Sequence, residues 1–329
     1  MKIDLRKLLK MWINWLGGFR LENGEINLER KFLKEFKFME RIMKKTIFIT
    51  GGNRGIGFQL CRKFATQYNF KVYMGARDLH KAKQSINKIG SENIIPIEID
   101  IEFEESILKA YKEYLRIKHK DEKLDIFINN AAAQLDWSPN EWHIKTLEIP
   151  IELLDRIYRI NTFGCILTTK YFVDSMQSGS RIVNVTSGAG ELWDNNALKD
   201  FQIGYASSKT ALMMVTKKLS AAVRDKNIYV NCVCPDWCKT SMGGGEIDAP
   251  NTASDGANSI IKACFLDNEN PPSGKYFRNG YEIPVDIYCF GNYKQLERKF
   301  ENINKNIDKI AWWIPIRKWR DKFRKKMLE

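Results

Sequence analysis

The sequence predicts a doubly wound α/β fold with a mainly parallel sheet of about seven strands, and an amphipathic helical extension at each end. Short apolar, β-branched runs alternate with stretches of helical period, and several of the runs end in glycine or polar residues. The basic charge lies at the ends: residues 1–45 hold 12 Lys/Arg and 6 Asp/Glu, and residues 293–329 hold 12 and 5. The chain therefore divides into a basic N-terminal extension (1–45), a neutral α/β domain (46–292) and a basic aromatic tail (293–329).

The first predicted strand is followed by a glycine-rich turn and a helix. Lys45–Thr50 is a short apolar run, Thr50-Gly-Gly-Asn-Arg-Gly-Ile-Gly57 follows it, and Phe58–Ala65 has apolar residues at helical spacing. In this setting small residues let the backbone approach a pyrophosphate, and the helix N-terminus offers unpaired N–H groups. A glycine-rich turn alone also fits a simple tight turn, but the strand and helix around it favour dinucleotide binding.

Further strands are predicted along the chain, with chemically active side chains at their ends. In an open parallel sheet ligands bind beyond the carboxyl ends of the strands, so Asn130 and Ser187 should face one crevice. Asp100 is interpreted either as a ligand contact or as the cap of a helix from Glu102 to Tyr114. The predicted strands are Phe70–Ala76, Ile94–Asp100, Asp125–Ala132, Arg181–Ser187 and Ile228–Pro235.

Tyr205 and Lys209 lie four residues apart on a predicted helix from Gly204 to Val223. This spacing puts phenol and ammonium on one face. A neighbouring ammonium stabilises phenolate and is expected to lower the tyrosine pKa, which would make the phenol a better general acid near neutral pH. An incidental pair on an exposed helix is the alternative, and the Ser187-Gly-Ala-Gly190 segment upstream argues against it.

Taken together, these motifs resemble the short-chain dehydrogenase/reductase family, in the single-domain branch marked by the Thr-Gly-x-x-x-Gly-x-Gly spacing. The resemblance covers roughly Lys45 to Tyr293 and implies a nicotinamide-dependent oxidoreductase. It implies that Ser187 holds the substrate carbonyl, Tyr205 is the general acid/base, Lys209 also binds the nicotinamide ribose, and Asn161 positions a water behind Lys209. The cofactor contacts that it implies, with the residues above, are Thr50, Gly51, Asn53, Arg54, Gly55, Ile56, Gly57, Arg77, Asp100, Ile101, Asn130, Ala131, Pro235 and Thr240.

The end of the second strand bears on the choice of cofactor. An NAD enzyme carries an acid there for the ribose 2′-hydroxyl, whereas this chain has Gly75-Ala76-Arg77. An arginine fork suits a 2′-phosphate, and Arg54 could close on the same group. Two solvated surface arginines are the alternative. The pair of arginines favours NADP(H). The amino-acid sequence of these segments also resembles that of NADPH-dependent carbonyl reductases.

Two departures from the family pattern bear on activity. Ala132 and Asp236 stand where the family usually has glycine, and a non-glycine residue is strained where φ is positive. The expected substrate is a ketone, an aldehyde or the corresponding alcohol. The alternative is an NADP(H)-binding scaffold with little turnover. The segments Pro139–Pro150 and Ser241–Ala253 are expected to flank the substrate. Trp137, Trp142 and Trp193 are interpreted either as lining it or as residues of the core or the surface.

The chain's 7 cysteines show no paired metal-ligand spacing with its 3 histidines, so no metal site is expected. We expect a cytoplasmic protein for three reasons. The thiols are predicted to be reduced, no apolar run reaches about 18 residues, and no secretory signal is recognised. Homo-oligomer formation stays open.

The two extensions are patterned as cationic amphipathic helices. Leu5, Leu8, Leu9 and Trp12 recur at helical spacing, and Trp312, Trp313 and Trp319 lie in a tail rich in Lys and Arg. This pattern is typical of helices that lie on an anionic membrane surface, here the inner face. Docking of the extensions on the domain, or on each other, is the second interpretation. Nucleic-acid binding is the third, and no recognition motif supports it.

Overall fold

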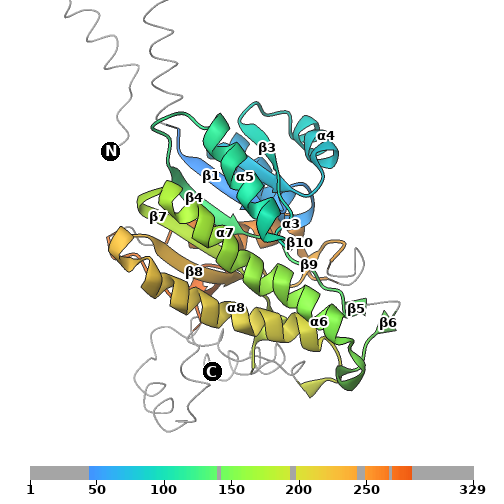
Figure 1. Cartoon of the computed structure of the whole chain (residues 1–329). Helices are drawn as coiled ribbons and strands as arrows, with labels where there is room; N and C mark the ends of the chain where they lie inside the picture. Colours follow the sequence, from blue (N-terminus) through green and yellow to red (C-terminus); the bar gives the residue numbers. More distant parts are fainter. Residues whose placement is uncertain (1–43, 139–141, 193–197, 243–248, 267–268, 284–329) are drawn as a thin grey trace, which may run out of the picture. The chain divides into compact units, whose positions relative to one another are not determined.

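The computed structural model describes residues 44–138, 142–192, 198–242, 249–266 and 269–283. Its main sheet has 8 strands in the order β12-β11-β8-β7-β4-β1-β2-β3 (Figure 1). All neighbours pair in parallel except β11 and β12. The predicted doubly wound, mainly parallel sheet is confirmed, and the short antiparallel β12 adds an edge. The strands are β1 (Thr46–Thr50), β2 (Lys71–Ala76), β3 (Ile94–Glu98), β4 (Leu124–Asn129), β7 (Met176–Val185), β8 (Tyr229–Cys234), β11 (Tyr276–Arg278) and β12 (Tyr281–Glu282).

Two layers of helices cover the sheet because its strands are apolar on both faces. The side chains of Ile47 and Ile49 pack toward α3, α4 and α9, while Phe48 of the same strand packs toward α5, α7 and α8. Figure 1 shows α5, α7 and α8 crossing the near face. The helices are α3 (Gly55–Thr66), α4 (Leu79–Ile89), α5 (Glu104–Ile117), α6 (Ile151–Tyr158), α7 (Gly164–Phe172), α8 (Ile203–Ala222) and α9 (Ala253–Cys264).

The order of the strands reverses between β1 and β4. From β1 the chain builds outward through β2 and β3, and from β4 it builds the other way through β7, β8 and β11. The loops that leave β1 and β4 therefore diverge to opposite faces and open a crevice at their carboxyl ends. Thr50 ends β1 and Asn130 follows β4, so both lie at this point.

Local sequence explains where the helices near the site begin. Asp78 caps α4 by accepting a hydrogen bond from the Lys81 N–H at 3.1 Å. Asp100 does not cap α5 as one interpretation of the sequence expected. The helix begins after Phe103, and the Asp100 carboxylate accepts instead from the Glu102 N–H at 3.1 Å within the turn after β3.

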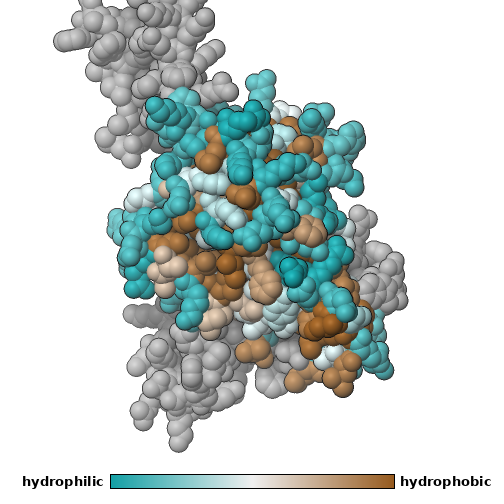
Figure 2. All heavy atoms as spheres, in the orientation of Figure 1, coloured by the Kyte–Doolittle hydropathy of each residue, from teal (hydrophilic) through white to brown (hydrophobic). Residues whose placement is uncertain are grey.

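The interpretations of the two terminal extensions fall on residues 1–43 and 284–329, outside the described part of the chain. None of the helices described is both long enough and apolar enough to pass through a membrane. The six cysteines in the described ranges are buried and unpaired. Figure 2 shows apolar side chains gathered where α6 begins, and there Leu147 and Ile151 are 98% and 68% exposed.

Two small two-stranded sheets lie in the connecting segments. One pairs β5 (Trp137–Ser138) with β6 (Trp142–His143), and the other pairs β9 (Cys238–Lys239) with β10 (Asn251–Thr252). The second sheet anchors both ends of the predicted flanking segment that starts at Ser241, and it brings that segment back toward α9.

Candidate functional site

A cleft of about 920 Å³ opens at the carboxyl ends of the parallel strands. Every site residue predicted from the sequence lines it, except Thr50 and Asn161. These two are fully buried behind the cleft wall. The structure therefore brings the glycine turn, the ends of β2 and β3, and the Ser187, Tyr205 and Lys209 side chains into a single space.

The glycine turn forms a cradle against the N-terminus of α3. Gly51 and Gly55 have φ of +66° and +54°, a region that favours glycine. A Cβ on Gly57 would lie 2.1 Å from the Gly51 carbonyl oxygen, so only glycine lets the helix approach the turn. The first turn of α3 holds no acidic residue, and Arg54 provides no side-chain cap. An anion can therefore bind these N–H groups, and the cradle fits a pyrophosphate.

Thr50 and Asn130 hold the two sides of the crevice together. The Thr50 hydroxyl accepts hydrogen bonds from the N–H groups of Asn130 and Ala131, both at 3.0 Å. The Asn130 side-chain amide donates to the carbonyl oxygens of Thr50 at 3.0 Å and Gly51 at 3.2 Å. Thr50 thus acts behind the cradle by positioning the chain that follows β4.

Three basic residues stand around the end of β2. Arg54 and Arg77 are exposed and line the cleft, and Arg54 donates to the Ser241 hydroxyl at 3.4 Å. The nearby acid, Asp78, is engaged in capping α4. Lys81 also lines the cleft, 3.7 Å from the Asp78 carboxylate. Sequence reasoning missed Lys81, although its position one turn after Arg77 was a usable signal.

Lys209 and Tyr205 project from α8 beside Ser187, which follows β7. The Lys209 ammonium is buried and donates to the Val185 carbonyl oxygen at 2.8 Å. It lies 5.8 Å from the centre of the Tyr205 ring. The Ser187 hydroxyl accepts from the Ala189 N–H at 3.2 Å, which fixes the short turn after the strand.

The expectation that Lys209 lowers the pKa of Tyr205 is wrong for this structure. Burial raises the pKa of Tyr205 to about 12, and a hydrogen bond with Ser187 opposes the rise. Burial also lowers the pKa of Lys209 to about 8. In both cases burial disfavours the charged form and is the largest cause of the shift. At neutral pH the phenol is protonated and is a proton donor.

Asn161 lies in the π-helical turn Arg159–Phe163, between α6 and α7. Its side chain accepts from the Ala133 N–H and donates to the Ala133 carbonyl oxygen, each at 2.8 Å. It also donates to the Ser208 hydroxyl at 3.0 Å. Asn161 therefore ties the chain after β4 to α8 next to Lys209, and its role in positioning a water behind Lys209 stays a prediction.

Asp136 caps the helix that carries the tyrosine, and sequence reasoning missed it. One of its carboxylate oxygens accepts from the N–H groups of Gly204 at 2.8 Å and Tyr205 at 3.0 Å. The residue before the helix, Gln202, provides no side-chain cap. Nothing in the local sequence reveals this partner, because Asp136 lies on a separate segment.

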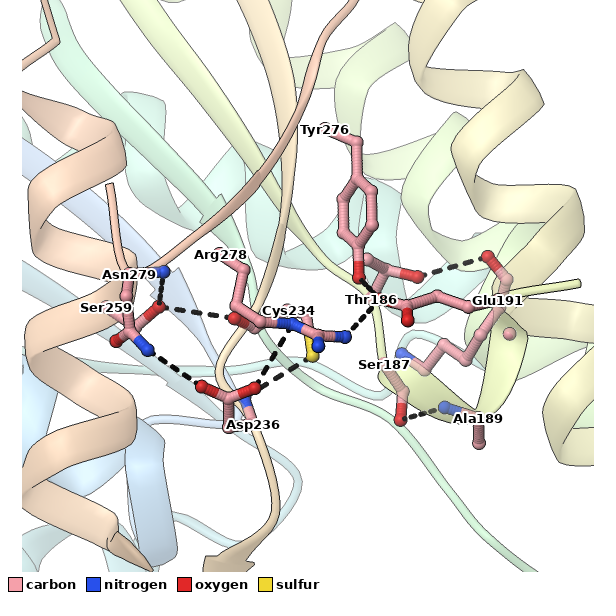
Figure 3. A network of polar contacts seen from close by, with 12 residues as sticks. Thr186, Ser187, Ala189, Glu191, Cys234, Asp236, Ser259, Tyr276, Arg278 and Asn279 are labelled. Atoms are coloured by element: carbon pink, nitrogen blue, oxygen red, sulfur yellow. Dashed lines mark hydrogen bonds and ion pairs between the residues drawn. The ribbon is translucent and has the colours of Figure 1, made fainter. Parts of the chain in front are cut away.

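The two departures from the family pattern are accommodated differently. Ala132 is not among the residues with positive φ, so its methyl group causes no backbone strain. Asp236 has φ of +62°, which is the left-handed region that costs about 1–2 kcal/mol for an L-residue. Its carboxylate pairs with Arg278 at 3.1 Å and accepts from the Asn279 amide at 2.9 Å (Figure 3). These contacts hold the strained conformation.

The other end of the cleft is walled by aromatic and apolar residues. Trp137 stacks on Phe201 with ring centres 6.1 Å apart, and both line the cleft. Ser241 and Met242 line it from the predicted flanking loop. Trp193 lies outside the described residues, and only the backbone of Trp142 is described. Across the described ranges there is no group of three or more His, Cys, Asp or Glu side chains placed to hold a metal ion.

Comparison with solved structures finds the same fold in other proteins. The structure of NADPH-bound carbonyl reductase from chicken fatty liver matches with a TM-score of 0.63 at 23% identity, over 73% of this chain and 98% of that one. The structure of ElxO with NADP bound matches with a TM-score of 0.62 at 27% identity, over 72% and 98%. The first likeness concerns the fold alone.

Sequence comparison extends over the same domain. Short-chain dehydrogenase anuI of Penicillium roqueforti is 30% identical over 240 residues, which cover 69% of this chain and 90% of the relative. Salutaridine reductase of Papaver bracteatum is 25% identical over 295 residues, covering 70% and 92%. The short chain dehydrogenase family model matches residues 45–250. Since that match runs from the cradle through the tyrosine helix to the loop of Asp236, this chain is a member of the short-chain dehydrogenase family.

Proposed function

We propose that the protein transfers hydride between NADP(H) and a carbonyl or alcohol substrate. The observation that carries this proposal is the meeting of Ser187, Tyr205 and Lys209 with the glycine cradle in one cleft. A proton donor, a hydroxyl that can hold a carbonyl oxygen and a dinucleotide cradle are the components that reduction of a carbonyl requires.

The choice of NADP(H) rests on charge at the adenosine end of the cleft. Arg54, Arg77 and Lys81 line it, while the Asp78 carboxylate is used as a helix cap. Three cations suit a 2′-phosphate, and the Asp78 carboxylate, which also lines the cleft, is engaged by the Lys81 N–H and lies 3.7 Å from the Lys81 ammonium. The NADP-bound ElxO structure, at 27% identity, supports the same choice.

A nicotinamide cofactor held by the glycine cradle would supply the hydride for the carbonyl carbon. The Tyr205 hydroxyl donates its proton to the carbonyl oxygen, and the Ser187 hydroxyl holds that oxygen in place. The phenolate left on Tyr205 lies near the Lys209 ammonium, whose orientation is set by the Val185 carbonyl oxygen. The products are an alcohol and the oxidised cofactor, and Tyr205 regains a proton from solvent.

The aromatic end of the cleft favours an apolar substrate. Trp137 and Phe201 stack on each other there, and Met242 also lines the cleft. Such surfaces bind aromatic or aliphatic groups more strongly than polyhydroxylated ones. A panel of carbonyl compounds is expected to show higher kcat/KM for aromatic ketones and aldehydes than for sugars of similar size.

The scaffold alternative and the membrane surface need separate tests. The hypothesis of a catalytically weak scaffold rests on Ala132 and Asp236, and the structure accommodates both residues. Oxidation of NADPH over a carbonyl panel, beside a binding assay, separates an enzyme from a scaffold. Attachment to anionic lipid rests on the charge and tryptophans of residues 1–45 and 293–329.

The first prediction concerns cofactor choice. The protein is expected to bind NADPH more than tenfold more tightly than NADH, because each charge-assisted phosphate contact contributes about 1.5–3 kcal/mol. Arg77→Ala should remove most of the difference while NADH affinity changes little. Dissociation constants measured by fluorescence titration check this, and equal values for the two cofactors in the unmodified protein contradict it.

The second prediction concerns Tyr205. Tyr205→Phe removes the donated proton but leaves the cradle, so turnover of a good substrate should fall by about 10²–10⁴-fold. NADPH affinity should stay within about threefold, because no phosphate contact is lost. Steady-state kinetics and cofactor titration on the same preparation check both parts. Full turnover by the phenylalanine variant would exclude the role assigned to Tyr205.

The third prediction concerns pH. Lys209 has a lowered pKa of about 8, so it is charged below that value and becomes neutral as the pH rises through it. Tyr205 stays protonated over the same range. The kcat/KM for reduction should therefore be level near pH 7 and fall tenfold per pH unit well above pH 8. A level profile up to about pH 10 would contradict this reading of Lys209.

The fourth prediction concerns the extensions. Deletion of residues 1–40 and 306–329 should abolish binding to anionic vesicles and spare NADPH affinity, because no predicted cofactor contact lies there. Added salt should weaken vesicle binding by the full-length chain, since charges are screened over about 8 Å at physiological ionic strength. Replacing Trp312, Trp313 and Trp319 by Ala should weaken it without changing net charge.

Sedimentation with anionic and neutral vesicles, run beside a melting curve, checks this fourth prediction. Little vesicle binding together with a large loss of thermal stability on deletion would favour extensions that dock on the domain. Failure of the full-length chain to sediment with anionic vesicles at low salt would end the membrane hypothesis.

A further inference from the structure

Arg278 ends β11 and joins two loops that line the cleft. It lies beside Cys234 in the parallel register of β11 and β8. Its Nε atom is 3.1 Å from an Asp236 carboxylate oxygen, and its Nη2 atom pairs with Glu191 (Figure 3). Asp236 belongs to the loop after β8 and Glu191 to the loop after β7. One guanidinium therefore bridges the ends of two neighbouring strands.

The Glu191 side of this bridge holds the loop of Ser187. Ser187 begins the short turn Gly188–Gly190, and Glu191 ends it. The Glu191 side chain is buried and accepts hydrogen bonds from both Arg278 and the Tyr276 hydroxyl. A Cβ on Gly188 would lie 3.2 Å from Arg278 Nη2, so the guanidinium packs directly against this turn.

The Asp236 side holds the loop that begins at Pro235. Both carboxylate oxygens are engaged, one with Arg278 and the other with the Asn279 amide. The Asp236 N–H donates to the Cys234 sulfur at 3.4 Å. These contacts fix a left-handed residue at the start of a loop whose later members, Trp237 and Thr240, line the cleft.

We propose that Arg278 is a positioning residue, which fixes the Ser187 turn against the Pro235 loop and so sets the distance between the substrate carbonyl and the cofactor. This inference rests on the proposed function, in which Ser187 holds the carbonyl and the Pro235 loop borders the cofactor. Displacement of a reacting group by about 1 Å can lower a rate by about 100-fold, so a bridge between these two loops affects turnover more than binding.

The charge of the cluster decides which variants test the bridge. Two carboxylates face one guanidinium, so replacing Arg278 by an apolar residue would leave two buried acids unpaired and endanger folding. Arg278→Lys keeps the positive charge, but an ammonium cannot match the fork that spans both acids. Glu191→Gln keeps the shape and leaves the Asp236 contact of Arg278 in place, but it weakens the hydrogen bonds that Glu191 accepts from Arg278 and Tyr276.

The chain offers a matched control at the opposite end of the sheet. Glu122 is a partly buried carboxylate that accepts from the Tyr73 hydroxyl and pairs with Lys71 at 2.7 Å. Its surroundings thus repeat the tyrosine and cation around Glu191, but at the amino ends of the strands, away from the cleft. Glu122→Gln should lower the melting temperature without changing turnover.

Steady-state kinetics with NADPH and the best carbonyl substrate test the proposal. Arg278→Lys should lower kcat by about tenfold or more, and Glu191→Gln by at least about threefold, with the NADPH dissociation constant within about threefold in both. Unchanged kcat in both variants overturns the proposal. An equal loss of kcat in Glu122→Gln also overturns it, because general destabilisation would then explain the effect.

Amide hydrogen exchange tests the same bridge without turnover. Arg278→Lys should speed exchange in the segment from Ser187 to Glu191 by about tenfold, and Glu122→Gln should leave that segment unchanged. Unaltered exchange there in Arg278→Lys overturns the bridge itself. If the unmodified protein reduces no carbonyl compound, the proposed function fails, and the exchange result then decides whether Arg278 holds the loops.

Discussion

The site depends on one contact, the hydrogen bonding of the Thr50 hydroxyl to the N–H groups of Asn130 and Ala131. It joins β1 and β4 at the place where the strand order reverses. In addition, the Asn130 side-chain amide donates to the carbonyl oxygens of Thr50 and Gly51, the first two residues of the glycine turn. Since these partners are backbone groups at the rim of a sheet, the hydroxyl satisfies them and sets the width of the crevice. The cradle and the segment that leads to Asp136 both start from this point.

Burial then decides the chemistry of the groups that face the crevice. Tyr205 and Lys209 share a helix face, and Lys209 is buried while Tyr205 is partly buried in the cleft wall. Exclusion of water disfavours both phenolate and ammonium, so the pKa of the tyrosine rises while that of the lysine falls. The Asp136 carboxylate on the N-terminus of α8 adds to the rise, and the Ser187 hydroxyl opposes it. The result suits a protonated phenol that donates to a substrate oxygen as that oxygen gains negative charge.

The departure of residue 236 from the family pattern is explained by the residues that Asp236 contacts. Asp236 occupies a left-handed position where glycine is the ordinary choice, and its strain is offset by Arg278 and Asn279. Arg278 is in turn held by Glu191, which receives the Tyr276 hydroxyl. Ion pairs of this kind contribute when every member is satisfied, and they are costly when one partner is removed. Residue 236 thus belongs to a set that includes β11 and the turn after Ser187.

The sequence by itself determined the order of strands and helices, the glycine turn and the Tyr205–Lys209 pair. These features depend on local periodicity and on short spacings, which act within a few residues along the chain. Only the tertiary structure decided the roles of Asp136, Glu191 and Arg278. Each of them acts on a partner that is distant in sequence and comes near only when the chain folds. The direction of the Tyr205 pKa shift was decided there as well, because burial, its largest cause, is a property of the folded chain.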